Sequence, residues 1–195
     1  MSRVVRRFTR RVPRWRPRVT PVRLDQATPL QRDALKITPS NTRVSDYVLT
    51  LAHDPESLRV RSPLFNAIMY DRGGLSRAER EIGALAASMV NRCLFCAAVH
   101  ADRHATLEKD AHVTDELFAK GEKAELGQRE RALFDFASKL SRAPAEAGGG
   151  DVQALRDAGL DDGEILDLVL STALFGWANR LMHVLGDPIA TEPQA

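Results

Sequence analysis

The sequence has few of the features that define several large classes of protein. Of its 195 residues only two are cysteine, two are tryptophan and two are tyrosine, and aromatic residues make up 6% of the chain. Two cysteines cannot build the disulfide framework of a small secreted domain. No run of about eighteen apolar residues occurs, so we expect no transmembrane helix. The N-terminus lacks the apolar segment of a secretory signal, and we expect none.

Acidic residues are missing from the first 23 positions, which carry nine arginines. The other 19 basic residues stand against 26 acidic ones, so the body of the chain has a net charge of −7, whereas the whole chain has +2. A basic arm on an acidic body is expected to dock against that body or against a neighbouring subunit. Pro13, Pro17 and Pro21 favour an extended arm. Nucleic-acid binding is the weaker alternative, because single-strand binders present several stacking aromatics and Trp15 is the candidate here.

The sustained alternation and the Val-, Ile- and Thr-rich runs of a β-sheet are also missing. Helix starts, by contrast, recur at Thr28-Pro29, at Asp54-Pro55 and at Ser76, which heads a capping box with Glu79. The sequence therefore predicts an all-α protein, with an Arg/Pro-rich arm over residues 1–24, one helical domain over 25–190 and a tail over 191–195. The later helices are predicted at 76–91, 93–107, 113–121, 127–141, 151–158, 161–175 and 177–185. Before them, Pro39 is expected to end a first helix, Asn41 or Ser45 to start a second, and Leu58, Leu64 and Phe65 to share the apolar stripe of a third.

Two segments 85 residues apart resemble each other, Gly74–Glu79 and Gly159–Glu164. Each is a Gly-Leu break followed by a polar cap and an amphipathic helix, then a short break and another helix. This similarity predicts an internal repeat of a helical module. Under the same offset the two cysteines fall on Ala178 and Leu181, so the second copy would have lost the reactive groups.

The reactive residues of the chain gather between positions 81 and 104. Cys93 and Cys96 form a C-x-x-C pair, His100 follows four residues later, and Glu81 precedes the pair by twelve. On one helix the two cysteines and the histidine fall within a sector of about 60°, so they can touch. A helix start, with Asn91 as a local cap, would lower a thiol pKa. An antiparallel preceding helix would bring Glu81 beside His100, fixing its tautomer and raising its basicity for removal of a thiol proton.

Other interpretations of the cysteine pair remain open, including a buried packing pair. Zinc is the main rival because His104 adds a fourth possible ligand to Cys93, Cys96 and His100. However, Cys93 and His104 are separated by about 16 Å along one helix. A tetrahedral site needs all its ligands within about 2.3 Å of the metal, so we expect no metal. We expect His104 to be a supporting or surface residue. Haem attachment is excluded because Ala97, and not histidine, follows Cys96.

The pattern E-x11-C-x-x-C-x-x-x-H in an all-helical chain resembles the AhpD-like alkylhydroperoxidases of the carboxymuconolactone decarboxylase superfamily. The resemblance covers roughly residues 45–110, and the segment 177–186 is similar to the C-terminal region of the peroxidase-related branch. It implies an all-α fold that assembles as a trimer or hexamer and needs no haem, flavin or metal cofactor.

The same resemblance implies a role for each reactive residue. Cys96 would attack the peroxide, Cys93 would resolve the resulting sulfenic acid, and Glu81 and His100 would relay the proton. Phe95 departs from the pattern, because AhpD has a further histidine just before its second cysteine.

We therefore expect a thiol-dependent alkyl hydroperoxide reductase, an antioxidant oxidoreductase. An external dithiol or lipoyl-type reductant would restore its disulfide. A reducing cytoplasm suits such a cycle. Two alternatives stay open, a non-catalytic redox-responsive oligomeric binding module and a general disulfide reductase. Neither a membrane nor a nucleic acid is an expected partner.

Overall fold

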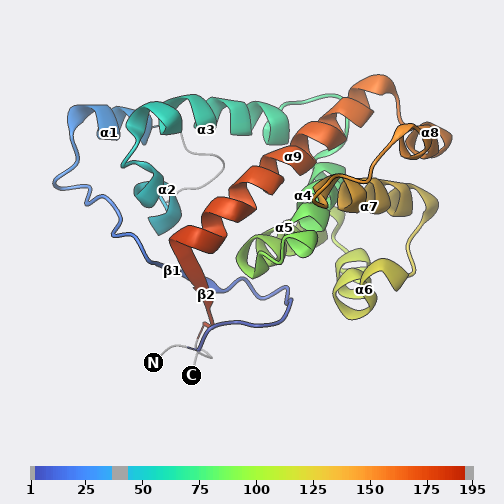
Figure 1. Ribbon diagram of the computed structural model, residues 1–195, viewed down its shortest axis with the longest axis horizontal. Coiled ribbons are helices and arrows are strands. Elements are labelled where there is room, and N and C mark those ends of the chain that lie inside the picture. Colours follow the sequence, from blue (N-terminus) through green and yellow to red (C-terminus); the bar gives the residue numbers. More distant parts are fainter. Residues whose placement is uncertain (1–2, 37–43, 192–195) are drawn as a thin grey trace.

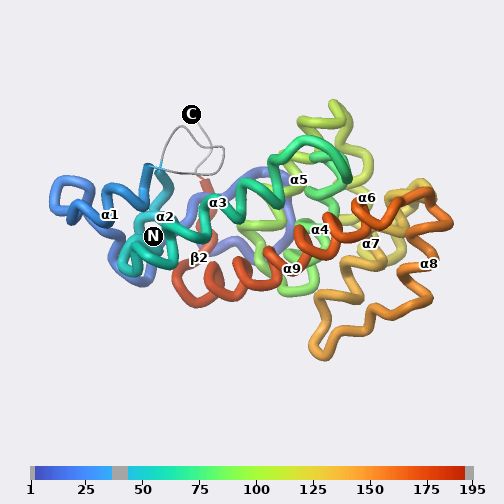
Figure 2. Tube along the Cα trace, turned by 90° about the horizontal axis from the view of Figure 1, so that it is seen from above, coloured from blue at the N-terminus to red at the C-terminus, as the bar shows by residue number. Residues whose placement is uncertain are grey.

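The protein is an elongated assembly of helices, as the computed structural model of residues 3–36 and 44–191 shows (Figure 1). Positions Pro39 and Asn41, and the tail from residue 192, lie outside the described residues. The prediction of an all-α chain is confirmed. The helices are α1 (Pro29–Ala34), α2 (Asp46–Leu51), α3 (Pro55–Tyr70), α4 (Arg77–Val90), α5 (Leu94–Glu108), α6 (His112–Lys120), α7 (Gln128–Ser141), α8 (Gly149–Asp157) and α9 (Asp162–Leu185), with a 3-10 turn at Gly121–Lys123. Seen from above, α1 and α2 lie at one end and α6, α7 and α8 at the other, with α9 running between them (Figure 2).

Helix α4 is the centre of the molecule. It packs against α5, α7 and α9, and every residue from 80 to 88 is buried. Gly83 allows α9 to come close, since a Cβ there would lie 2.9 Å from Oγ1 of Thr172 and 3.0 Å from Cδ1 of Leu168. This crossing encloses Glu81, on the same stretch of α4, in the interior.

Local capping explains where most helices begin. Thr28, Ser45, Asp54 and Ser76 each accept a hydrogen bond from the backbone of the first turn, as expected for N-cap residues. One predicted core position is wrong. Leu64 is 56% exposed, because Pro63 and Leu64 face outward while the neighbouring Phe65 is buried.

Helix α9 is continuous, so the predicted break between residues 175 and 177 is wrong. Phe175 and Ala178 lie on the buried face on either side of Gly176, and their packing outweighs the weak helix propensity of glycine. Asp161 heads a capping box like that of Ser76, but α9 has no counterpart of the break between α4 and α5. The internal repeat is therefore not confirmed. Helix α9 is long and apolar enough to cross a membrane, yet half of its apolar window is buried inside the molecule, which is typical of a core helix.

A two-stranded antiparallel sheet, which the sequence did not predict, joins the N-terminal arm to the end of the chain. Strand β1 (Arg14–Pro17) pairs with β2 (Gly186–Ile189). The backbone N–H of Val5 also donates to the carbonyl of Pro188 at 2.9 Å. Each strand has four residues and one of them is proline, so neither shows a strand pattern by itself.

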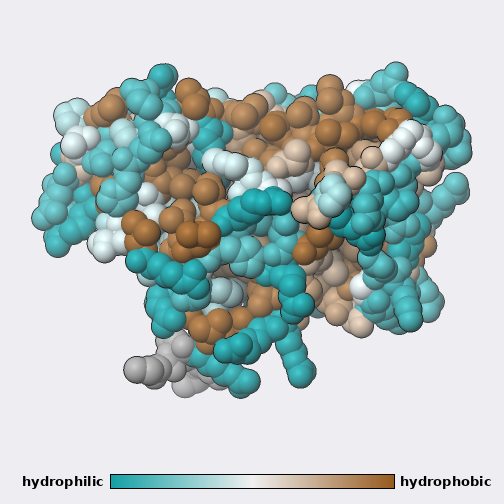
Figure 3. All heavy atoms as spheres, in the orientation of Figure 1, coloured by the Kyte–Doolittle hydropathy of each residue, from teal (hydrophilic) through white to brown (hydrophobic). Residues whose placement is uncertain are grey.

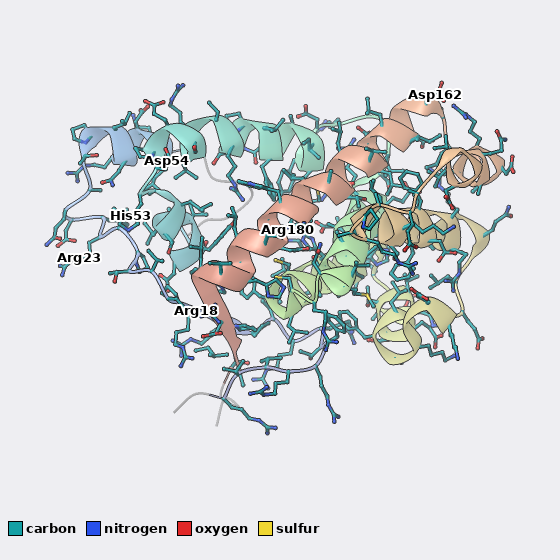
Figure 4. All side chains as sticks on the ribbon, viewed as in Figure 1. Arg18, Arg23, His53, Asp54, Asp162 and Arg180 are labelled. Carbon is teal, nitrogen blue, oxygen red and sulfur yellow. The ribbon has the colours of Figure 1, made fainter. Side chains whose placement is uncertain are left out.

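The arm docks on the body of its own chain, as the charge asymmetry predicts. Arg10 pairs with Asp115 at 2.6 Å, and Arg16 pairs with Asp187 at 3.3 Å. Arg18 lies at the C-terminal end of α9, opposite the end that carries Asp162 (Figure 4). Its guanidinium donates to the carbonyl of Val184 at 3.2 Å, where a cation complements the helix dipole.

Candidate active site

The two cysteines form a buried, reduced pair at the start of α5. Cys93 is the N-cap residue and Cys96 lies in the first turn, with the two sulfur atoms 2.9 Å apart. A disulfide bond is about 2.05 Å long, so the pair can be oxidised by a small local movement. Asn91 does not cap this helix as expected. Instead its side chain donates to the carbonyl of Ala87 at 2.9 Å and closes the end of α4.

Glu81 and His100 are in direct contact, as the antiparallel arrangement of α4 and α5 predicts. Nδ1 of His100 donates to one oxygen of the Glu81 carboxylate, and Arg77 donates to the other. Glu81 and His100 are 0% and 1% exposed. A carboxylate can only accept, so Nδ1 carries the hydrogen and Nε2 is left as an acceptor. Phe175 packs edge-on against the imidazole, with ring centroids 4.0 Å apart, and fixes the plane of the ring.

Burial sets the protonation state of the Glu81–His100 pair. Burial opposes the charged carboxylate, but His100 and Arg77 together hold the pKa of Glu81 below its usual value. For His100 burial has the larger effect, and it lowers the pKa even though Glu81 raises it. Glu81 therefore makes the imidazole more basic, as expected, but burial outweighs this effect. The site holds an ionised carboxylate beside a neutral histidine, which can accept a proton at Nε2.

The two thiols have very different acidities. The hydrogen bond between the sulfurs lowers the pKa of Cys93, and the backbone N–H groups of Cys96 and Phe95 lower it further against the effect of burial. The same sulfur–sulfur hydrogen bond, with burial, raises the pKa of Cys96 well above its usual value. Of the two thiols, Cys93 is therefore the one that loses its proton more readily, and the pair titrates as a unit.

Cys96 opens into a cavity of about 590 Å³ that His100 also lines. Cys93 does not line this cavity and faces a smaller one of about 160 Å³. Phe95 lies between the two and lines both. Among the described residues no hydrogen bond joins Cys96 to His100, so a proton passing between them needs a water molecule or the substrate as a bridge.

Three further residues, which were not predicted from the sequence, complete the site. Arg77 holds Glu81, as described above. Asn179 is fully buried, lies against both thiols and is hydrogen-bonded to Ser88 at 3.1 Å.

Tyr47 packs with the two cysteines and meets Trp15 of the arm edge-on, with ring centroids 5.7 Å apart. Burial raises the pKa of Tyr47 far above its usual value, so its hydroxyl is a neutral donor. Of these three residues, only Asn179 lies in a segment to which the sequence drew attention, the one similar to the peroxidase-related branch.

His104 does not line the Cys96 cavity. It is 3% exposed and lines another cavity of about 440 Å³ with Glu108 and Arg129, so of the two expectations, a supporting or a surface residue, the surface position is wrong. Within residues 3–36 and 44–191, no group of three His, Cys, Asp or Glu side chains is placed to hold a metal ion.

An all-α fold that buries a C-x-x-C pair beside a glutamate–histidine pair defines a narrow class of proteins, and the comparisons agree. Residues 55–139 match the carboxymuconolactone decarboxylase family. The alkylhydroperoxidase AhpD core protein of Ralstonia eutropha JMP134, described as an uncharacterized peroxidase-related protein, is 34% identical. The alignment covers 85% of this chain and 88% of that one, with a TM-score of 0.72. The chain therefore belongs to the carboxymuconolactone decarboxylase family and is an AhpD-like protein within it.

Two further solved structures share the fold. A peroxidase-related protein of Silicibacter sp. TM1040 is 28% identical over 86% of this chain and 90% of that one, with a TM-score of 0.71. The debrominase Bmp8 is 18% identical over 86% of this chain and 89% of that one, with a TM-score of 0.67, and shows the fold alone. No curated protein matches the sequence.

Proposed function

We propose that the protein is a thiol-dependent hydroperoxide reductase of the AhpD type. The observation that carries the proposal is that Cys96 and His100 line one cavity while Cys93 lies 2.9 Å from Cys96. An attacking thiol, a neutral base and a resolving thiol are thus all within reach of one bound substrate. Family membership supports the same reaction class.

In the first step His100 accepts the Cys96 proton at Nε2. The Cys96 thiolate attacks the terminal oxygen of the hydroperoxide, so the S–O bond forms as the O–O bond breaks. The sulfur is oxidised by two electrons, and the alkoxide that leaves takes the proton from His100 to become an alcohol. Glu81 stabilises the imidazolium while it exists.

In the second step the Cys93 thiolate attacks the Cys96 sulfenic acid. The S–S bond forms, the S–O bond breaks, and the hydroxide that leaves is protonated by solvent to water. The lowered pKa of Cys93 favours the thiolate form that this step uses. An external dithiol, of the lipoyl type in AhpD, then gives two electrons to the disulfide by thiol–disulfide exchange. A cytoplasmic location supplies such a reductant.

The proposal is tested by mixing reduced protein with cumene hydroperoxide in a stopped-flow instrument and following loss of the thiols. We expect rapid oxidation of the wild type to the disulfide. If the wild type reacts no faster than the Cys93→Ser/Cys96→Ser double variant, the peroxidase function is wrong. A wild type that is inert toward hydroperoxides but reduces small disulfides would indicate the general disulfide reductase instead.

A further inference from the structure

Arg61 of α3 lines the cavity into which Cys96 opens, and its charge has no acidic partner. Its Nε and Nη1 atoms are buried and have no hydrogen-bond partner among the described residues, and no ion pair with a described carboxylate includes it. Its neighbour on the helix, Arg59, is paired with Glu56 at 3.1 Å on the surface. Arg61 therefore differs from an ordinary surface arginine in both its burial and its lack of an anion.

Aromatic rings hold the Arg61 guanidinium in place. It lies 4.3 Å from the centre of the Phe65 ring, 5.9 Å from that of Tyr47 and 6.0 Å from that of Trp177. Contacts of this kind stabilise a cation through the face of the ring. They do not satisfy the Nε and Nη1 donors, and a buried donor without an acceptor is unfavourable. The arrangement positions a planar cation beside the Tyr47 hydroxyl and gives it no carboxylate among the described residues.

The Tyr47 hydroxyl connects this cation to the reactive sulfur. It is buried, interacts with the Arg61 guanidinium, and lies within electrostatic range of Cys96. Two further arginines, Arg14 of the arm and Arg103 of α5, line the same cavity, whereas Asp46 is its one acidic side chain within the described residues. The cavity as a whole therefore favours an anion.

The size and walls of the cavity favour an organic molecule over hydrogen peroxide. Its volume of about 590 Å³ is within the range of sites for drug-sized ligands, roughly 300–1,000 Å³. Apolar side chains make up much of the wall, among them Val12, Phe95, Val99 and Met182. A hydrocarbon body would pack against these residues and leave its charged group to the arginine.

From these contacts we infer that the cavity selects organic hydroperoxides that carry a carboxylate. Arg61 binds the carboxylate through its planar fork, which matches the geometry of two carboxylate oxygens. The apolar wall holds the body of the molecule, and the hydroperoxide group lies at Cys96 and His100. This inference rests on the proposed function for the reaction, but the recognition of the anion by Arg61 can be tested without turnover.

The first test measures binding of an unreactive anion. Octanoate and 1-octanol have the same chain length and differ in charge, and Trp15 at the cavity provides a fluorescence signal in the wild-type protein. We expect octanoate to bind at least about tenfold more tightly than octanol, as for a hydrogen bond to a charged group. Arg61→Gln should abolish this preference, Arg61→Lys should keep part of it, and the surface control Arg59→Gln should leave it intact. Equal affinities in the wild type, or a preference that Arg61→Gln leaves unchanged, would overturn the inference.

The second test separates the choice of substrate from the reaction itself. The substrates are cumene hydroperoxide, its 4-carboxy derivative and the methyl ester of that derivative. We expect kcat/KM at least about tenfold higher for the carboxylate than for the ester, with Arg61→Gln lowering only the value for the carboxylate. A loss shared by all three substrates would show that Arg61 is structural and refute the inference. If the wild type consumes none of them, the proposed function fails, and the octanoate titration still decides whether Arg61 recognises anions.

Discussion

His100 donates through Nδ1 to Glu81 in the closed interior of the molecule, and this contact leaves Nε2 as the acceptor of the ring. Arg77 occupies the second carboxylate oxygen, so Glu81 cannot turn away from the histidine. The tautomer of a catalytic histidine usually depends on such a partner. Here the partner comes from the preceding helix, which explains the eleven residues between Glu81 and the first cysteine.

Glu81→Gln should lower the rate of peroxide reduction by roughly 10²-fold. The amide can donate to Nδ1, which places the histidine hydrogen on Nε2 and removes the acceptor. The measurement is the single-turnover rate of thiol oxidation, with the thermal midpoint recorded to confirm folding. Glu79→Gln is the matched control, because it lies on the same helix and glutamine also serves at the third position of a capping box. Equal rates for the two variants would contradict the relay.

Substitution of each cysteine should separate the two thiol roles. We expect Cys93→Ser to accumulate a sulfenic acid at Cys96 that dimedone traps, because the attack can occur and the resolution cannot. Cys96→Ser should give no such adduct, even though Cys93 has the lower pKa, since only Cys96 lines the His100 cavity. Mass spectrometry of the adducts checks this. A dimedone adduct on Cys93 in Cys96→Ser would reverse the assigned roles.

The protein should lose stability as the pH falls below about 6.5. The folded state holds His100 below this ordinary pKa, so the unfolded chain binds the proton more readily and acid favours unfolding. Glu81 adds to the loss only at lower pH, because its folded pKa is lowered and its contribution disappears on protonation. Each group contributes at most about 1.4 kcal/mol per pH unit.

Thermal midpoints between pH 7.5 and 5.5 provide the measurement. His100→Asn should flatten the dependence, with a residual slope from His104, whose pKa burial also lowers. His112→Asn, at an exposed position, should leave the slope unchanged. If His100→Asn retains the full wild-type slope, His100 is not the group that titrates.

Gly186→Ala should detach the N-terminal arm. A Cβ at this position would overlap the indole of Trp15 and lie 2.7 Å from the carbonyl oxygen of Arg16. We expect trypsin to cleave the arm several-fold faster and a maleimide to label the cysteines faster. Gly150→Ala is the control, because its Cβ would have no atom within 4 Å. Identical cleavage of the two variants would show that the contact with Trp15 does not hold the arm.

The chain should assemble as a homo-oligomer through α3 and α9. Figure 3 shows hydrophobic residues along the part of the surface where α3 and α9 lie. The exposed apolar side chains of these two helices include Val60, Leu64, Leu166, Leu170, Trp177 and Val184. A patch of this kind commonly marks an interface, and we propose that a second copy covers it. Light scattering should give the mass of a trimer or hexamer. Leu64→Glu/Leu166→Glu should dissociate it, whereas Leu107→Glu on α5 should not. A monomeric wild type would contradict the proposal.

The local parts of the fold could be predicted from the sequence. Capping residues such as Ser76 act within one turn of helix, so their signal is complete in a few positions. The juxtaposition of Glu81 and His100 followed from two helices joined by a short turn. The helix break predicted at Gly176 was wrong because tertiary packing decides this position. Phe175 and Ala178 pack into the core and keep the helix continuous.

The rest of the candidate site depends on contacts between distant parts of the chain. Tyr47 and Arg61 come from α2 and α3, and nothing near them in the sequence indicates that they meet at the cavity of Cys96. The sheet was missed for the same reason, because β1 and β2 stand about 170 residues apart and each is stable only with the other. The net lowering of the His100 pKa could not be predicted, because the sequence showed its charged partner but not the extent of its burial.

The pairing of β1 with β2 also sets an order of events during synthesis. The arm leaves the ribosome about 170 residues before the strand that it needs. Trp15 therefore cannot dock beside the thiols until β2 has emerged, so we expect the helices to form first and the arm to close over them. A nascent chain stalled before residue 186 should keep both cysteines open to labelling, and release should protect them.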